Sequence, residues 1–194
     1  MRFRNTSASW GALSKILHWL VVFLIIIQWA FAKYAAAQPL SGKLAPLSLH
    51  KSFGITILAL TIIRLTWRLL SRGPSTLASL RPWERPLARI SHVLLYGLIT
   101  VLPLTGWLMS SARNFPVSWF GVFQLPDLAP PSHLLFEEMK HLHEVLFTGL
   151  IAVALLHCLG ALKHHFLDRN EVLIRMLPFA RIDDLRGKPS GRGE

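Results

Sequence analysis

Four of the nine histidines lie inside or beside long apolar stretches, where their side chains could bind a metal ion. His18 is near the start of the first stretch, and His50 is near the start of the second. His143 and His157 share the fourth stretch, 14 residues apart. That spacing keeps both rings on one face of a helix, about 21 Å apart along its axis. Ionisable groups inside a membrane span are costly, so each is a candidate functional residue.

Depth along the predicted spans places these histidines in two pairs. His50 and His143 fall at one level, and His18 and His157 fall at the other. Two neutral imidazoles held across a cavity are what low-spin haem iron needs above and below its plane. A single cysteine, Cys158, excludes a thiolate zinc or iron–sulfur site. Two haems are the interpretation we favour, and the alternative is a cofactor-free protein whose histidines only form hydrogen bonds.

The composition predicts the elements that would position these rings. Of the 194 residues, 52% are hydrophobic and 16% are charged, which is a lower charge content than soluble domains have. We expect an all-α integral membrane protein, a four-transmembrane-helix bundle enclosing two b-type haems. Its domain would cover residues 1–180, followed by a basic, disordered tail at 181–194. The expected helices are 13–36, 47–70, 90–110 and 138–166.

The first apolar stretch also resembles a secretory signal peptide, because Ala30-Phe31-Ala32 is a cleavage-like sequence. Its length and the histidine inside it favour a helix that stays in the membrane.

Basic residues define the expected orientation. Of the 21 Lys and Arg residues, 16 fall on the side that holds both termini and the connection between the second and third spans. The positive-inside rule then places both termini in the cytoplasm of a multi-pass protein of the bacterial inner membrane. A formal charge of +11 could also indicate nucleic-acid binding, but these basic residues lie between apolar stretches, so we expect no nucleic-acid partner.

Three further polar residues lie near the level of His18. Arg64 is 14 residues beyond His50, so it shares that face and could pair with haem propionates; the alternative is a side chain that extends to the lipid headgroups. His92 and His164 are candidates for a quinone site, because quinone reduction needs proton-carrying groups. Simple interfacial histidines are the alternative for both.

Several short segments together form a recognisable pattern. They are Leu17-His18-Trp19-Leu20, His50-Lys51-Ser52-Phe53-Gly54-Ile55, Ser91-His92-Val93-Leu94-Leu95-Tyr96, Pro103-Leu104-Thr105-Gly106, His143-Glu144, His157, His164-His165 and Arg175-Met176-Leu177-Pro178. Over about residues 10–178 the chain thereby resembles the bacterial di-haem cytochrome b561 family, and within it most closely the superoxide oxidases.

This resemblance implies a function and a set of ligands. His18 and His157 would bind the inner haem b, and His50 and His143 the outer one. Electrons would pass between a periplasmic donor, superoxide in the superoxide oxidases, and ubiquinone in the lipid bilayer. Electron entry would lie near the basic residues Lys51, Arg113 and Lys140, which could steer an anion. The alternative is an electron-carrier subunit that serves a separate dehydrogenase or a periplasmic partner protein.

Overall fold

The computed structural model describes residues 3–6, 9–71, 73 and 80–178 of the chain. Four long helices dominate it: α1 (Ala12–Ala37), α2 (Leu44–Leu70), α3 (Glu84–Ala112) and α4 (His133–Phe166). Two short 3-10 helices, η1 (Leu40–Gly42) and η3 (Ile174–Met176), and a hairpin of β1 (Ser118–Trp119) and β2 (Phe123–Gln124) complete it. The predicted four-helix architecture is therefore confirmed.

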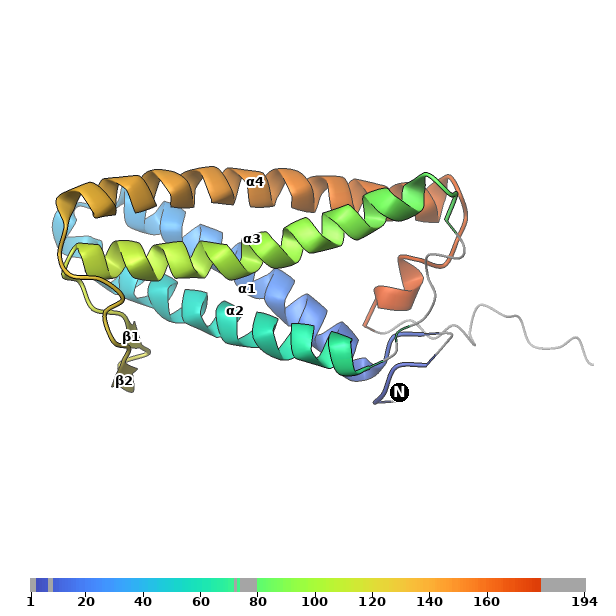
Figure 1. Cartoon of the computed structure of the whole chain (residues 1–194), viewed down its shortest axis with the longest axis horizontal. Helices are drawn as coiled ribbons and strands as arrows, with labels where there is room; N and C mark the ends of the chain where they lie inside the picture. Colours follow the sequence, from blue (N-terminus) through green and yellow to red (C-terminus); the bar gives the residue numbers. More distant parts are fainter. Residues whose placement is uncertain (1–2, 7–8, 72, 74–79, 179–194) are drawn as a thin grey trace, which may run out of the picture.

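The helices lie roughly along one common axis (Figure 1). Helix α1 packs on α2, α2 on α3, and α3 on α4. The hairpin lies at one end of the bundle, where the chain passes from α3 to α4. We call this the His50 end, and the opposite end, where α1 begins and α4 finishes, the His18 end.

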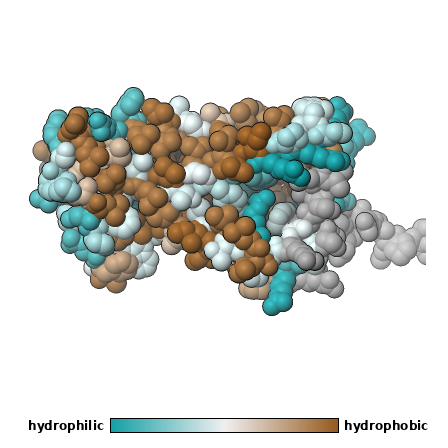
Figure 2. Space-filling view, in the orientation of Figure 1, coloured by the Kyte–Doolittle hydropathy of each residue, from teal (hydrophilic) through white to brown (hydrophobic). Residues whose placement is uncertain are grey.

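The surface of the bundle is that of a membrane protein. Each helix has 26 to 34 residues, or roughly 39 to 51 Å of rise, which exceeds the 30 Å of a typical hydrocarbon core. All four helices are long and apolar enough to cross a membrane. Hydrophobic residues cover the middle of the face in Figure 2, and hydrophilic residues gather towards its two ends. The lateral surface of the bundle therefore faces the lipid of the bilayer.

All four helices begin earlier than we expected, α1 and α2 by one and three residues and α3 and α4 by six and five. Helix α3 starts at Glu84 rather than residue 90, and the Glu84 carboxylate accepts the backbone N–H of Arg81 at 3.0 Å. Helix α4 starts at His133 rather than 138, because Ser132 caps it by accepting the N–H of Leu135 at 3.3 Å. The predicted tail at 181–194 lies outside the described residues.

Candidate functional site

The rings of His50 on α2 and His143 on α4 face each other at one level of the bundle. Their centroids are 6.4 Å apart, and the ring planes are inclined by 65°. A metal–imidazole bond is about 2 Å long. Two such bonds end to end, plus the distance from each nitrogen to its ring centre, account for this separation. The structure therefore brings together the residues that we paired at this level, at a distance suited to one metal ion between them.

Both rings of this pair have a hydrogen-bond partner at Nδ1. His50 Nδ1 lies 3.1 Å from the backbone carbonyl oxygen of Gln28, which can only accept. His143 Nδ1 lies 3.0 Å from the Thr105 hydroxyl, which donates its own hydrogen to the Leu102 carbonyl at 2.7 Å. Each Nδ1 must therefore carry the proton, and each Nε2 keeps a lone pair. This tautomer is the one required of a neutral imidazole ligand.

Sequence reasoning missed the residues that hold this pair in place. Gln28 interrupts an apolar run, and its amide nitrogen donates to the His50 carbonyl at 2.6 Å. Gly106 lies beneath His143, where an added Cβ would be 3.2 Å from the ring carbon Cε1. A glutamine in the middle of a span was the available signal, because a buried amide needs a partner.

Three histidines gather near the His18 end. The ring of His157 contacts that of His92 on α3, with centroids 5.1 Å apart. His18 is within electrostatic range of both His157 and His92. Within the described residues, the buried Nδ1 of His18 has no hydrogen-bond partner, whereas His92 Nδ1 lies 2.6 Å from the Ala88 carbonyl oxygen. The expected partners His18 and His157 are thus neighbours, but His92 joins them.

Arg64 lies beside this cluster. It is within electrostatic range of both His18 and His157, and its guanidinium carbon is 5.4 Å from the centre of the Tyr96 ring. Arg68 contacts the same ring at 5.6 Å. Two cations thus flank one aromatic ring beside the histidines, where they could attract an anionic group.

His164 belongs to a separate ionic network at the end of α4. Its Nδ1 lies 2.7 Å from an Asp168 oxygen, which also receives the Lys163 ammonium at 2.9 Å; Lys163 bonds the buried Glu84 as well. These contacts, Lys163 first, lower the pKa of the Asp168 carboxyl below its usual value. Glu84, His164 and Asp168 are close enough to share a cation, but the Lys163 ammonium already binds both carboxylates.

The three basic residues expected near electron entry are placed differently from one another. The Lys51 ammonium donates to the Phe115 carbonyl at 3.1 Å and lies 4.0 Å from the centre of that ring. Arg113 stacks over Phe136 at 4.6 Å. Lys140 is exposed and pairs with Glu137 at 3.9 Å, so its charge is partly offset. Only the first two adjoin the loop that follows α3.

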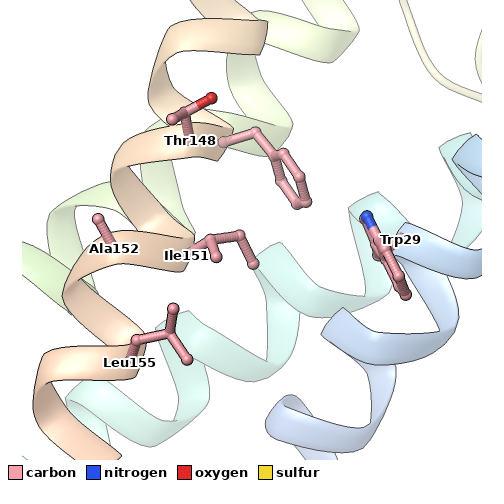
Figure 3. A pocket seen from close by; sticks show the side chains of 6 residues that line it. Trp29, Thr148, Ile151, Ala152 and Leu155 are labelled. Carbon is pink, nitrogen blue, oxygen red and sulfur yellow. The ribbon is translucent and has the colours of Figure 1, made fainter.

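An apolar cavity of about 590 Å³ separates α1 from α4 (Figure 3). Trp29 of α1 faces the side chains of α4 that lie between His143 and His157. Leu150, the one buried residue among those described on α4, is halfway between these histidines in sequence. The cavity therefore lies on the apolar path from one histidine level to the other. It is lined by Trp29, Phe147, Thr148, Ile151, Ala152 and Leu155.

Comparison with known proteins agrees with this geometry. Residues 9–179 match the family described as prokaryotic cytochrome b561. The chain belongs to this family. It is 33% identical to cytochrome b561 homolog 2 of Escherichia coli strain K12 over 180 residues, 91% of this chain and 95% of the relative. It is 30% identical over 165 residues to a Yersinia pestis protein named "Probable superoxide oxidase CybB", covering 85% of this chain and 93% of that protein.

Family membership establishes the general role. Proteins of this family are membrane electron-transfer proteins that bind b-type haem, and the chain is accordingly a bacterial membrane oxidoreductase. Its residues fit such a group, because paired imidazoles with free Nε2 lone pairs lie beside an apolar cavity. A bound haem supplies one-electron redox chemistry, and the protein supplies ligands, an apolar environment and nearby charges.

Proposed function

We propose that this chain is a di-haem b cytochrome that transfers electrons from superoxide on the periplasmic side to ubiquinone. The observation that carries the proposal is the pair of His50 and His143, 6.4 Å apart and both protonated at Nδ1, with a second histidine cluster 14 residues further along α4. One haem would be held by His50 and His143, and the other by His18 and His157.

The direction of transfer follows from the proposed orientation. The excess of Lys and Arg in the sequence segments on the side of His18 supports a cytoplasmic position for that side and for both termini. The His50 end then faces the periplasm, and electrons enter there. Leu150 and the largely apolar side chains that line the cavity lie between the two levels, and such side chains make this path unfavourable for water.

Superoxide as donor is supported by charge and by similarity. Lys51 follows His50 directly, and Arg113 begins the loop that Lys51 contacts. Both are cations at the end where an anionic donor would arrive, and such charges raise the rate of encounter. The similarity to the Yersinia protein points to the same donor. Two superoxide anions would each lose one electron to give O₂.

Ubiquinone as acceptor is supported by the groups at the His18 end. Its reduction to ubiquinol takes the two electrons and two protons, so proton-carrying side chains must lie close by. His92 packs against His157, and His164 bonds Asp168 near the surface. Arg64, flanking Tyr96, would stabilise anionic groups at this level, haem propionates included.

Purified protein with a short-chain ubiquinone and added potassium superoxide tests both substrates at once. We expect ubiquinol to form and each superoxide to yield one O₂, twice the yield of spontaneous dismutation. The matched control is His143→Ala, which should contain less haem and give the dismutation yield. Ubiquinol formation at the control rate would contradict the proposal, even if the spectrum shows b-type haem.

An electron-carrier subunit is the second candidate. Exposed apolar residues at the His50 end, such as Val122 and Phe123, would favour it if they dock a protein partner. Haem reduction by superoxide in the isolated protein separates the two functions, because a carrier subunit would be reduced only in the presence of its partner.

A further inference from the structure

The β1–β2 hairpin presents apolar side chains that the other described residues cover only in part. Val122 is 73% exposed, Phe123 52% and Phe120 41%. These residues surround a tight turn in which the Val122 N–H donates to the Trp119 carbonyl at 2.9 Å. Figure 1 shows the hairpin beside the end of the bundle, away from the bundle axis. An exposed apolar turn in this place requires a partner.

The hairpin is held firmly against α2. The hydroxyl of Ser52, 1% exposed, lies 2.9 Å from the Ser118 carbonyl oxygen and accepts the Phe120 N–H at 3.0 Å. The Trp119 indole donates to the Thr56 hydroxyl at 3.1 Å. Phe120 also packs edge-on against Phe53, with ring centroids 5.1 Å apart. The turn is therefore a fixed part of the bundle.

These anchor points set the depth of the hairpin. Lys51 is the last charged residue of α2 before an apolar run that continues to Arg64, so its ammonium marks the polar boundary of the bilayer. Ser52 is one residue past that boundary, and Thr56 is five residues past it, roughly 7.5 Å deeper along the helix. Interfacial segments bury their apolar face about 5–10 Å into the boundary between headgroups and acyl chains.

The backbone of the hairpin suits that depth. Ser118 pairs with Gln124 and Trp119 with Phe123, and the Leu125 N–H donates to the Val117 carbonyl at 2.8 Å. The Phe120 N–H is bonded to Ser52 and the Val122 N–H to the Trp119 carbonyl, so these two amides of the turn have partners within the protein. Such pairing is required where water is scarce.

The backbone of the turn is strained at Phe120, and contacts with neighbouring rings hold that residue in place. Phe120 has a φ of 48° and Gly121 one of 75°. A positive φ is easy for glycine but unfavourable for a bulky residue. The contacts of Phe120 with Phe53 and Trp119 hold it in this conformation.

We propose that the β1–β2 hairpin is a membrane-interface anchor whose turn, with Phe120, Val122 and Phe123, inserts into the lipid leaflet beside α2. Its partner is the boundary between headgroups and acyl chains, with Lys51 and Arg113 at the level of the lipid phosphates. The anchor holds the loop after α3 against the segment of α2 that carries His50. A docking site for a soluble protein would instead lie above the level of Lys51.

Site-specific labelling tests this placement in the haem-loaded protein. The chain has one cysteine, Cys158, so Cys158→Ala gives a background whose haem spectrum is checked first. Val122→Cys is then labelled with an environment-sensitive fluorophore in lipid nanodiscs that hold one copy each. Asp127→Cys, exposed in the same loop, is the matched control.

We expect the label at residue 122 to emit at shorter wavelength than the control. Nitroxides near the top of the acyl chains should quench it several-fold more strongly than they quench the control, and iodide in the buffer should quench it several-fold less. Quenching by iodide alone would overturn the proposal in favour of an aqueous docking face. Protection from both quenchers that appears only in liposomes with many copies would overturn it in favour of a second chain.

Discussion

The two ends of the bundle hold their histidines in different ways. At the His50 end, two rings face each other, and each Nδ1 has a partner supplied by a neighbouring helix. At the His18 end, three rings crowd together with Arg64, and the buried Nδ1 of His18 has no partner in the described part of the chain. Carboxylates, Lys163 and His164 lie just beyond them.

This difference suits the two ends to different parts of an electron-transfer reaction. A pair with fixed tautomers and few charges is a rigid holder, suited to one-electron transfer without proton movement. A cluster of histidines beside cations and ionised carboxylates suits a reaction in which protons accompany electrons. If the proposed function holds, histidines at both ends would bind haem and the His18 end would also supply protons, and each expectation can be tested.

Replacing His143 by alanine should have the largest effect. The variant loses one of the two histidines that would hold a haem at the His50 end, so we expect the haem content to fall from two per chain to about one. The bundle should still insert, because apolar length drives insertion. Haem per protein, measured as the pyridine haemochrome, checks the first expectation, and recovery in the membrane fraction checks the second.

The matched control for this variant is His141→Ala. His141 lies two residues away on α4 and is exposed, so its loss should leave both haems in place. Two haems in the His143→Ala protein would show that the pair at the His50 end is not a ligand pair.

Substitutions at the His18 end should have the next largest effect. They distinguish the roles of His18 and His92, which are both neighbours of His157. We predict that His18→Ala loses one haem, because His18 lies near His157 and is one of the two histidines that we propose hold the second haem. His92→Ala should keep both haems and lower the rate of ubiquinone reduction, because its ring lies beside the ligand. Haem content and ubiquinol formation are measured for both variants; the reverse pattern would make His92 the ligand.

The sequence predicted the spans and the histidine levels, but not the residues that hold the histidines in place. The length of the apolar stretches predicted the four spans, and the 14-residue spacing of His143 and His157 predicted the two histidine levels. Both features depend only on residues close together in the sequence. The contact of His92 with His157 and the role of Gln28 depend on how α1 and α3 are rotated in the bundle. The hairpin was missed because Ser118 to Gln124 folds through bonds to Ser52, 66 residues away from Ser118.

Removing a support at the His50 end should have an intermediate effect. In Thr105→Val, the proton on His143 Nδ1 loses its acceptor while the shape of the side chain is kept. Loss of such an outer contact typically weakens metal binding by roughly 10- to 100-fold. We therefore expect faster haem loss to apomyoglobin from this variant. Thr100→Val is the control, because that hydroxyl bonds only the Tyr96 carbonyl within α3; equal rates for the two would mean that Thr105 does not support the ligand.

The smallest expected effect is a loss of local stability at low pH, at the His18 end. Because Lys163 and His164 lower the pKa of Asp168, its folded carboxyl stays ionised to lower pH than in the unfolded chain. This stabilisation is complete above the unfolded pKa, about 3.9, and is lost as the pH falls through the folded value. Hydrogen exchange at the end of α4, corrected for intrinsic rates, should therefore speed up a few-fold below about pH 4. Asp168→Asn should remove that pH dependence, and a wild-type profile in the variant would place the acid response in Glu84 instead, because Lys163 bridges both carboxylates.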